Sequence, residues 1–162
     1  MRVLRLLPVL FLLGGEPLLR AAAGGDDAPP KLSAEEQTIL EWVNEVRGKE
    51  KRPLLKPQPQ LLAAARSHAA NMAKNKTLAH ELDGKNVTQR VEGAGYDYRE
   101  VGEILAGGDG PVPEFFPLWL KSPVHRAHLL KEAYREVGVA VARDDKGQLY
   151  ATVVFGVQRK KE

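Results

Sequence analysis

The chain has 162 residues, 43% of them hydrophobic, which is enough for one folded domain with a single core. Its 24 basic and 21 acidic residues give a net charge of +3, and the only basic cluster, residues 159–161, lies in a terminal tail, so the charge pattern gives no support for nucleic-acid binding. The absence of cysteine excludes disulfide bonds, cysteine nucleophiles and thiolate metal sites.

Residues 1–23 have the pattern of an export signal. Arginines near the start precede an apolar run that is too short to cross a bilayer, and the small residues at 21–23 suit signal cleavage. We therefore predict a signal peptide over residues 1–23, a flexible linker over 24–34, and a secreted or periplasmic protein. Cleavage removes three arginines and one glutamate, which leaves 21 basic and 20 acidic residues, and the remaining sequence has no transmembrane candidate.

The first predicted helix covers residues 34–47. Ser33 and Glu36 have the spacing of a capping box. Apolar residues then recur at helical spacing from Ile39 to Val46, which predicts that one face of this helix is buried.

A proline-rich loop and a second helix are predicted next. Residues 49–60, KEKRPLLKPQPQ, favour a loop in which Leu54 and Leu55 are core anchors. The stretch LLAAARSHAANMAKN, residues 61–75, predicts a helix with an apolar stripe. His68 lies beside that stripe and is expected to be a hydrogen-bonded histidine at the edge of the core.

The middle of the chain, residues 77–111, is interrupted by glycines and is predicted to be mostly irregular, with a short helix over 87–92. A further helix is predicted over 114–121. Pro117 falls within it and must lie in the first turn or bend the helix, since proline cannot donate a backbone hydrogen bond.

Two of the four histidines lie in the stretch WLKSPVHRAHLL, residues 119–130. Ser122 followed by Pro123 is a well-matched helix start. His125 then lies in the first turn, where the positive end of the helix dipole disfavours imidazolium, and a neutral imidazole is what a metal ligand or a general base requires. His128 is one turn further on an adjacent face. Local sequence is equally compatible with ordinary surface histidines.

The clearest β-hairpin covers residues 137–157, in which two alternating apolar runs flank a DDKG turn. Three large aromatic residues, Trp42, Trp119 and Phe155, are expected to be core anchors.

Common catalytic motifs are absent. His80 and Glu81 open like the helical zinc motif HExxH, but Gly84 occupies the position of its second histidine. The three serines lie in caps or mid-helix, and no G-x-S-x-G elbow occurs. Asn75 and Asn86 begin sequons, which matter only in a glycosylating secretory pathway.

Four stretches occur in an order that resembles the CAP superfamily, the domain shared by cysteine-rich secretory proteins, antigen 5 and pathogenesis-related proteins. They are LLAAARSHAANMAKNKTLAH, AGYDYREVGEILAGG, WLKSPVHRAHLL, and VGVAV with YATVVFG. The chain is most similar to the compact cysteine-free bacterial branch. The resemblance covers residues 35–158 as one domain, with 159–162 as a basic tail, and it implies an α+β fold, a three-layer α-β-α sandwich with a central antiparallel sheet.

The resemblance also implies an open cleft in which two histidines and acidic residues meet. The first cleft histidine falls on His80, the glutamate of the G-E-N motif on Glu103, and the second cleft histidine on His125. Two positions depart from the family pattern. The asparagine of G-E-N is Ile104, and the family's second cleft glutamate would fall on Ser122.

Three functional hypotheses follow. The first is an extracytoplasmic module whose cleft binds a small molecule, a lipid or a cell-envelope component, or weakly binds a divalent metal such as zinc through His80 and His125, with Glu103 as third ligand or as acceptor for one imidazole. The second is a protease-like hydrolase in which Glu103 or a histidine activates water. The third is a structural or adhesive extracellular domain.

Overall fold

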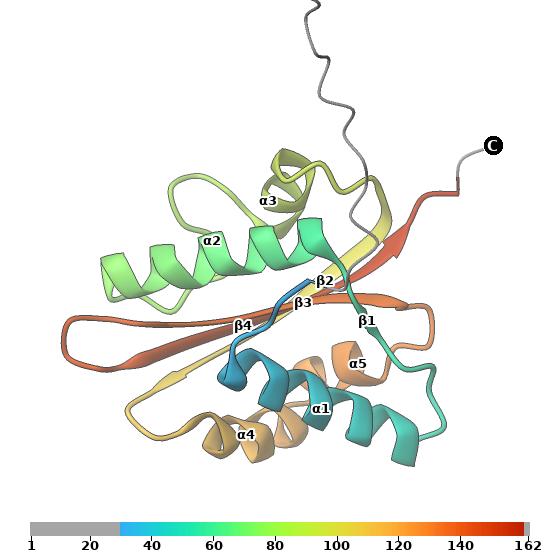
Figure 1. Ribbon diagram of the computed structural model, residues 1–162, viewed down its shortest axis with the longest axis horizontal. Helices are drawn as coiled ribbons and strands as arrows, with labels where there is room; N and C mark the ends of the chain where they lie inside the picture. Colours follow the sequence, from blue (N-terminus) through green and yellow to red (C-terminus); the bar gives the residue numbers. More distant parts are fainter. Residues whose placement is uncertain (1–29, 161–162) are drawn as a thin grey trace, which may run out of the picture.

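The computed structural model describes residues 30–160, and these form three layers (Figure 1). The predicted signal peptide, residues 1–23, and most of the predicted linker, residues 24–34, lie outside the described residues. In chain order the elements are α1 (Ala34–Lys49), β1 (Lys56–Pro57), α2 (Pro59–Asn75), α3 (Val87–Gly93), β2 (Tyr98–Gly108), the 3-10 helix η1 (Val112–Glu114), α4 (Phe115–Lys121), α5 (Pro123–Leu130), β3 (Glu136–Arg143) and β4 (Leu149–Gln158). The sheet lies in the middle, with α2 and α3 on one face and α1, α4 and α5 on the other. The predicted α-β-α sandwich is confirmed.

The sheet has the strand order β1-β3-β4-β2. The three long strands are antiparallel, as predicted, whereas the two-residue strand β1 pairs in parallel with β3, so the sheet as a whole is mixed. The predicted hairpin over 137–157 is confirmed as β3 and β4, with Val139 opposite Val153. Gly147 in its turn has a φ of 84°, which explains the glycine there.

Strand β2 corrects the prediction of a mostly irregular middle segment. It pairs with β4 almost along its whole length, from Tyr98 to Gly108. A Cβ added at Gly102 would lie 2.3 Å from the Tyr134 hydroxyl and 2.4 Å from Nδ1 of His128. This glycine therefore marks a close approach of α5 and the 131–135 segment to the strand, and not a break in the strand.

The helix predictions hold, with small shifts at the ends. Ser33 and Glu36 form the capping box of α1, with bonds of 2.8 and 3.2 Å. Pro117 is the third residue of α4, within its first turn, as required. Ser122 is the N-cap of α5, and its hydroxyl accepts a 3.4 Å bond from the backbone N–H of His125.

The main core lies between the sheet and the layer of α1, α4 and α5. Trp119 and Phe155 are fully buried in it, and the indole N–H of Trp119 donates to the carbonyl of Leu105. Trp42 is only partly buried, because it lies at the rim of this core and stacks on Phe116 with ring centroids 4.3 Å apart.

The loop before α2 shows one further correction. Leu55 is 3% exposed and is a core residue as predicted, but Leu54 is 60% exposed. Only one of the two leucines therefore reaches the core.

Arg47 joins distant parts of this layer. Its side chain is fully buried, and its guanidinium donates to the carbonyl oxygens of Pro53, Leu129, Lys131 and Tyr134. Two of these carbonyls belong to the end of α5 and the residue after it, where helix carbonyls lack intrahelical partners. Arg47 thus connects α1 to the end of the helix that carries His125.

Candidate functional site

Edge strand β2 places Glu103 on the α2 side of the sheet. Successive side chains of a strand point to opposite faces, so the neighbouring Ile104 lies on the other face, where it belongs to the main core. Ile104, which stands where the family motif G-E-N has asparagine, therefore contributes to packing between the sheet and α1. Glu103 itself has a side chain that is only 2% exposed.

Both carboxylate oxygens of Glu103 have partners. Oε1 accepts a 3.0 Å hydrogen bond from Nδ1 of His80. Oε2 accepts from Nη2 of Arg90 at 2.6 Å and from the Thr152 hydroxyl at 3.4 Å. Burial by itself raises the pKa of this carboxyl, but the hydrogen bond from His80 and the charge of Arg90 outweigh burial and hold the pKa below its ordinary value.

Arg90 is the residue of this site that the sequence did not indicate. It lies on α3, and its side chain is 8% exposed. Besides the ion pair with Glu103, its Nη1 donates to the carbonyls of His80 at 3.0 Å and Lys85 at 2.8 Å. Arg90 thus fixes the loop that carries His80 onto the buried carboxylate. Nothing in the local sequence distinguishes it from other arginines on exposed helices.

His80 lies on the loop between α2 and α3, with a side chain that is 61% exposed. Because a carboxylate can only accept, Nδ1 must carry the hydrogen of this contact, and Nε2 keeps its lone pair when the ring is neutral. His68 on α2 also holds the loop that carries His80. Its buried ring contacts the carbonyl of Ala79 through Nε2 at 2.9 Å. The expectation of a hydrogen-bonded core-edge histidine at His68 is confirmed.

His125 comes from α5, on the other side of the sheet. Burial, and next the charge of His80, lower the pKa of His125. Within residues 30–160, the buried Nδ1 atom of His125 has no hydrogen-bond partner. His128 has a different environment, since its Nδ1 lies 3.1 Å from the Tyr134 hydroxyl and its ring stacks on Phe155.

The fold and the site can now be compared with known proteins. The profile of the cysteine-rich secretory protein family, CAP, matches residues 40–156. The chain belongs to the CAP family. Its lack of cysteine agrees with the predicted cysteine-free type, and the relatives described next are bacterial.

Three bacterial proteins are similar to this CAP domain. The uncharacterized protein YkwD of Bacillus subtilis is 26% identical over 130 residues, which are 80% of this chain and 50% of YkwD, so the chain spans about half the length of that relative. An outer surface protein of Borrelia burgdorferi is 26% identical, with a TM-score of 0.71, over 82% of this chain and 100% of that one. An extracellular SCP-domain protein of Bacillus anthracis is 22% identical, with a TM-score of 0.67, over 80% of this chain and 45% of that one.

The imidazoles of His80 and His125 are the side chains of this site that could hold a metal ion. Among residues 30–160, no three His, Cys, Asp or Glu side chains are grouped as metal ligands. Glu103 has both oxygens engaged, which leaves the imidazoles of His80 and His125 as donors. Two imidazoles suit zinc, with the remaining positions left to water or a ligand.

No helix within residues 30–160 has the length and apolar character needed to span a membrane.

Proposed function

We propose that this CAP domain is an extracytoplasmic binding module, and that His80 and His125 hold a divalent transition metal, zinc being the first candidate, or the polar group of a small ligand. The observation that carries this proposal is the hydrogen bond between an almost fully buried carboxylate, Glu103, and an exposed imidazole, His80. Metal-binding histidines commonly donate their second ring N–H to such a carboxylate, which fixes the tautomer and raises the basicity of the ligating nitrogen.

The electrostatics of the second histidine support the same proposal. A ligating imidazole must be neutral, and the lowered pKa of His125 keeps it neutral at physiological pH. Its position in the first turn of α5, next to the positive end of the helix dipole, acts in the same direction.

Binding is favoured over hydrolysis by the environment of Glu103. A general base needs a free oxygen within reach of a water molecule. Glu103 is 2% exposed and both of its oxygens already accept hydrogen bonds, one of them from Arg90. A lowered pKa also makes this carboxylate a weaker base. Its geometry is that of a residue that orients His80.

The proposed location and ligand class follow from the relatives. Proteins with this fold include an outer surface protein and an extracellular protein. We propose the same extracytoplasmic setting for this chain, where a small molecule, a lipid or a component of the cell envelope is the natural ligand.

Isothermal titration of zinc into the purified protein at about pH 7.5, where imidazole is neutral, tests the metal proposal. We expect micromolar or weaker binding that is lost in His80→Ala and in His125→Ala. Glu103→Gln should weaken binding by about 10- to 100-fold, because the carboxylate behind His80 is removed. The matched control is Glu81→Gln, which changes the exposed neighbour of His80 and should bind as the parent does.

Two results would overturn this proposal. If both histidine variants bind zinc as the parent does, the metal lies elsewhere. If the parent gives neither heat nor a thermal shift with zinc, cobalt or nickel, the protein does not bind these metals.

A further inference from the structure

Strand β2 has one free edge, because β4 is its one partner among the described strands. The direction of its backbone groups follows from a bond elsewhere in the sheet. In an antiparallel pair every second residue is bonded to the residue opposite, and those between point away. Asp144 donates to the carbonyl of Gln148 in the register of the hairpin, so the even-numbered residues of β3 and β4 are bonded to each other. The odd-numbered residues of β4 therefore face β2, and one of them, Phe155, lies opposite Gly102.

Every second residue of β2 points away from the sheet. Since the backbone groups of Gly102 face β4, those of Val101, Glu103 and Leu105 face outward. One observed bond agrees with this direction: the carbonyl of Leu105 accepts from the indole of Trp119, a residue outside the sheet. The backbone N–H and C=O groups of Val101 and Glu103 have no hydrogen-bond partner within the described part of the chain.

The backbone of Glu103 is accessible although its side chain is not. The whole residue is 6% exposed, whereas its side chain is 2% exposed, so most of the exposed area belongs to the backbone. Val101 is partly exposed. Unpaired backbone groups on an accessible edge are where a further strand can add to a sheet.

Two imidazoles flank this part of the edge from opposite faces of the sheet. His80 lies on the α2 face, where its ring donates to the Glu103 carboxylate. On the other face, Nδ1 of His128 lies 2.4 Å from the position that a Cβ on Gly102 would have. A strand added here would run between the loop that carries His80 and helix α5.

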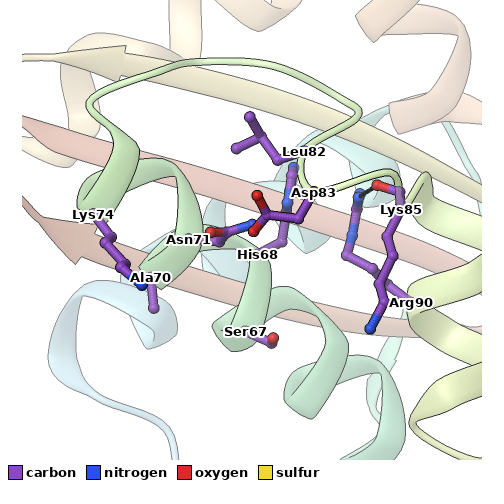
Figure 2. A pocket seen from close by; sticks show the side chains of 9 residues that line it. All are labelled: Ser67, His68, Ala70, Asn71, Lys74, Leu82, Asp83, Lys85 and Arg90. Atoms are coloured by element: carbon purple, nitrogen blue, oxygen red, sulfur yellow. Dashed lines mark hydrogen bonds between the residues drawn. The ribbon is translucent and has the colours of Figure 1, made fainter.

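The wall on the α2 side is already fixed. Nη1 of Arg90 donates to the carbonyls of His80 and Lys85, which ties two points of the loop to α3. Figure 2 shows Leu82 and Asp83 of this loop over α2, with Lys85 and Arg90 at one end. A ligand at the edge therefore meets a loop that does not have to be ordered on binding.

The open part of the edge is short. The register of β2 shifts at Arg99, which interrupts the ladder on one side. On the other side the carbonyl of Leu105 is already bonded. Val101 and Glu103 remain, and their outward groups repeat after about 7 Å along the strand. This length suits a peptide of about three residues, whereas edge-to-edge pairing of two copies of β2 would need a longer open stretch.

We propose that this edge binds a short peptide in extended conformation, which pairs with the backbone of Val101 and Glu103 between the His80 loop and α5. Each outward residue offers one donor and one acceptor, and a facing peptide residue offers one acceptor and one donor. The inference rests on the proposed function, since it names the ligand class of the same binding module, but it requires no metal.

Amide hydrogen exchange of the free protein tests the edge itself. Protection should alternate along β2. The N–H groups of Gly102 and Ile104, which face β4, should exchange at least about tenfold more slowly than those of Val101 and Glu103. Equal protection of all four would overturn the inference, because the edge would then have no free donor.

NMR titration in EDTA tests peptide binding. The probes are blocked tripeptides, acetyl-Thr-X-Thr-amide, with Val, Lys or Glu as X. We expect at least one of them to shift the N–H resonances of Val101 and Glu103 in a saturable way and to slow their exchange. Two analogues of that peptide, one N-methylated at X and one at both Thr residues, remove alternate donors. One analogue should bind at least about fivefold more weakly and the other as the parent peptide does, because alternate amides of a strand face opposite sides.

A pair of variants tests the protein side. Val101→Pro removes an outward N–H without removing a bond to β4, a position where a strand tolerates proline, and should weaken peptide binding at least about fivefold. Val101→Ala shortens the same side chain but keeps the N–H, and should bind as the parent does. The amide spectrum shows whether Val101→Pro is folded, and the exchange and analogue experiments on the parent protein do not depend on it.

The inference is overturned if no peptide gives a saturable shift, if the two analogues are affected equally, or if folded Val101→Pro binds as the parent does. Zinc binding measured without peptide separates this result from the metal proposal. Peptide binding in EDTA by a protein that does not bind zinc would contradict only the metal site, and zinc binding without peptide binding would contradict only the edge.

Discussion

His80 and Glu103 form a hydrogen bond of 3.0 Å between an imidazole that is largely in solvent and a carboxylate that is almost entirely out of it. The carboxylate is held by Arg90 from α3 and approached by Thr152 from β4. The exposed His80 ring is thus oriented by the Glu103 carboxylate, which is buried and held in place by its own partners. The hydrogen bond at Nδ1 therefore fixes the orientation of the His80 ring and leaves its Nε2 atom free to bind a ligand.

Removing the charge of Glu103 should destabilise the protein strongly. Glu103→Gln leaves the buried guanidinium of Arg90 without a counter-charge, and breaking a buried pair in this way costs about 3–5 kcal/mol. Urea denaturation of parent and variant at neutral pH measures the effect. Glu81→Gln, at an exposed site, should stay within about 0.5 kcal/mol of the parent, and an equally small loss for Glu103→Gln would show that the ion pair does not contribute to stability.

The same carboxylate predicts an acid limb in the stability profile. The pKa of Glu103 is lower in the folded protein than its ordinary value of 4.5, so the unfolded chain binds a proton more readily. The stability that Glu103 contributes is therefore complete above about pH 4.5 and is lost as the pH falls through the lower folded-state pKa. Denaturant midpoints between neutral pH and about pH 3 should fall more steeply for the parent than for Glu103→Gln. Parallel profiles would contradict this prediction.

Arg47 should be one of the most sensitive positions outside the site. Arg47→Met keeps much of the volume but leaves several buried carbonyl groups without their donor, so we expect a loss of about 3 kcal/mol or more. Arg99→Met is the matched control, because Arg99 is exposed. Thermal unfolding of the two variants side by side measures the difference. Equal melting temperatures would mean that water replaces the guanidinium at these carbonyls.

Two glycines should respond oppositely to the same substitution. Gly102→Ala would place a methyl group against Tyr134 and His128, and we expect a loss of about 1–3 kcal/mol, as for other overpacked sites. Gly93, the last residue of α3, has no atom within 4 Å of an added Cβ, so Gly93→Ala should be neutral or stabilising by up to about 1 kcal/mol. Chemical denaturation distinguishes the two, and a neutral Gly102→Ala would show that the α5 side adjusts at little cost.

Burial separates a core residue from an exposed residue of the candidate site. Trp119→Ala should cost about 3–5 kcal/mol, since the ring is fully buried and its N–H is bonded to the Leu105 carbonyl. His80→Ala should cost far less, because most of that side chain is already in solvent. Comparable shifts of the denaturant midpoint would identify His80 as a packed structural residue.

The sequence by itself determined the elements whose signal is local. The apolar repeat from Ile39 to Val46, the capping pair Ser33 and Glu36, and the alternation on both sides of the DDKG turn each report which face of a segment is buried. These patterns, together with the order of the four family-like stretches, were sufficient for α1, for the hairpin and for the layered α+β fold.

Only the tertiary structure decided which polar groups meet. Glu103 takes its ion-pair partner, Arg90, from another element, and three of the four carbonyls that Arg47 contacts lie more than 80 positions away. Periodicity reports that a side chain leaves water, but not which buried donor reaches which buried acceptor, because that depends on how distant elements pack. The same reason explains Gly102: it resembles a break in the sequence, and the neighbours that require a glycine inside β2 come from α5 and the segment that follows it.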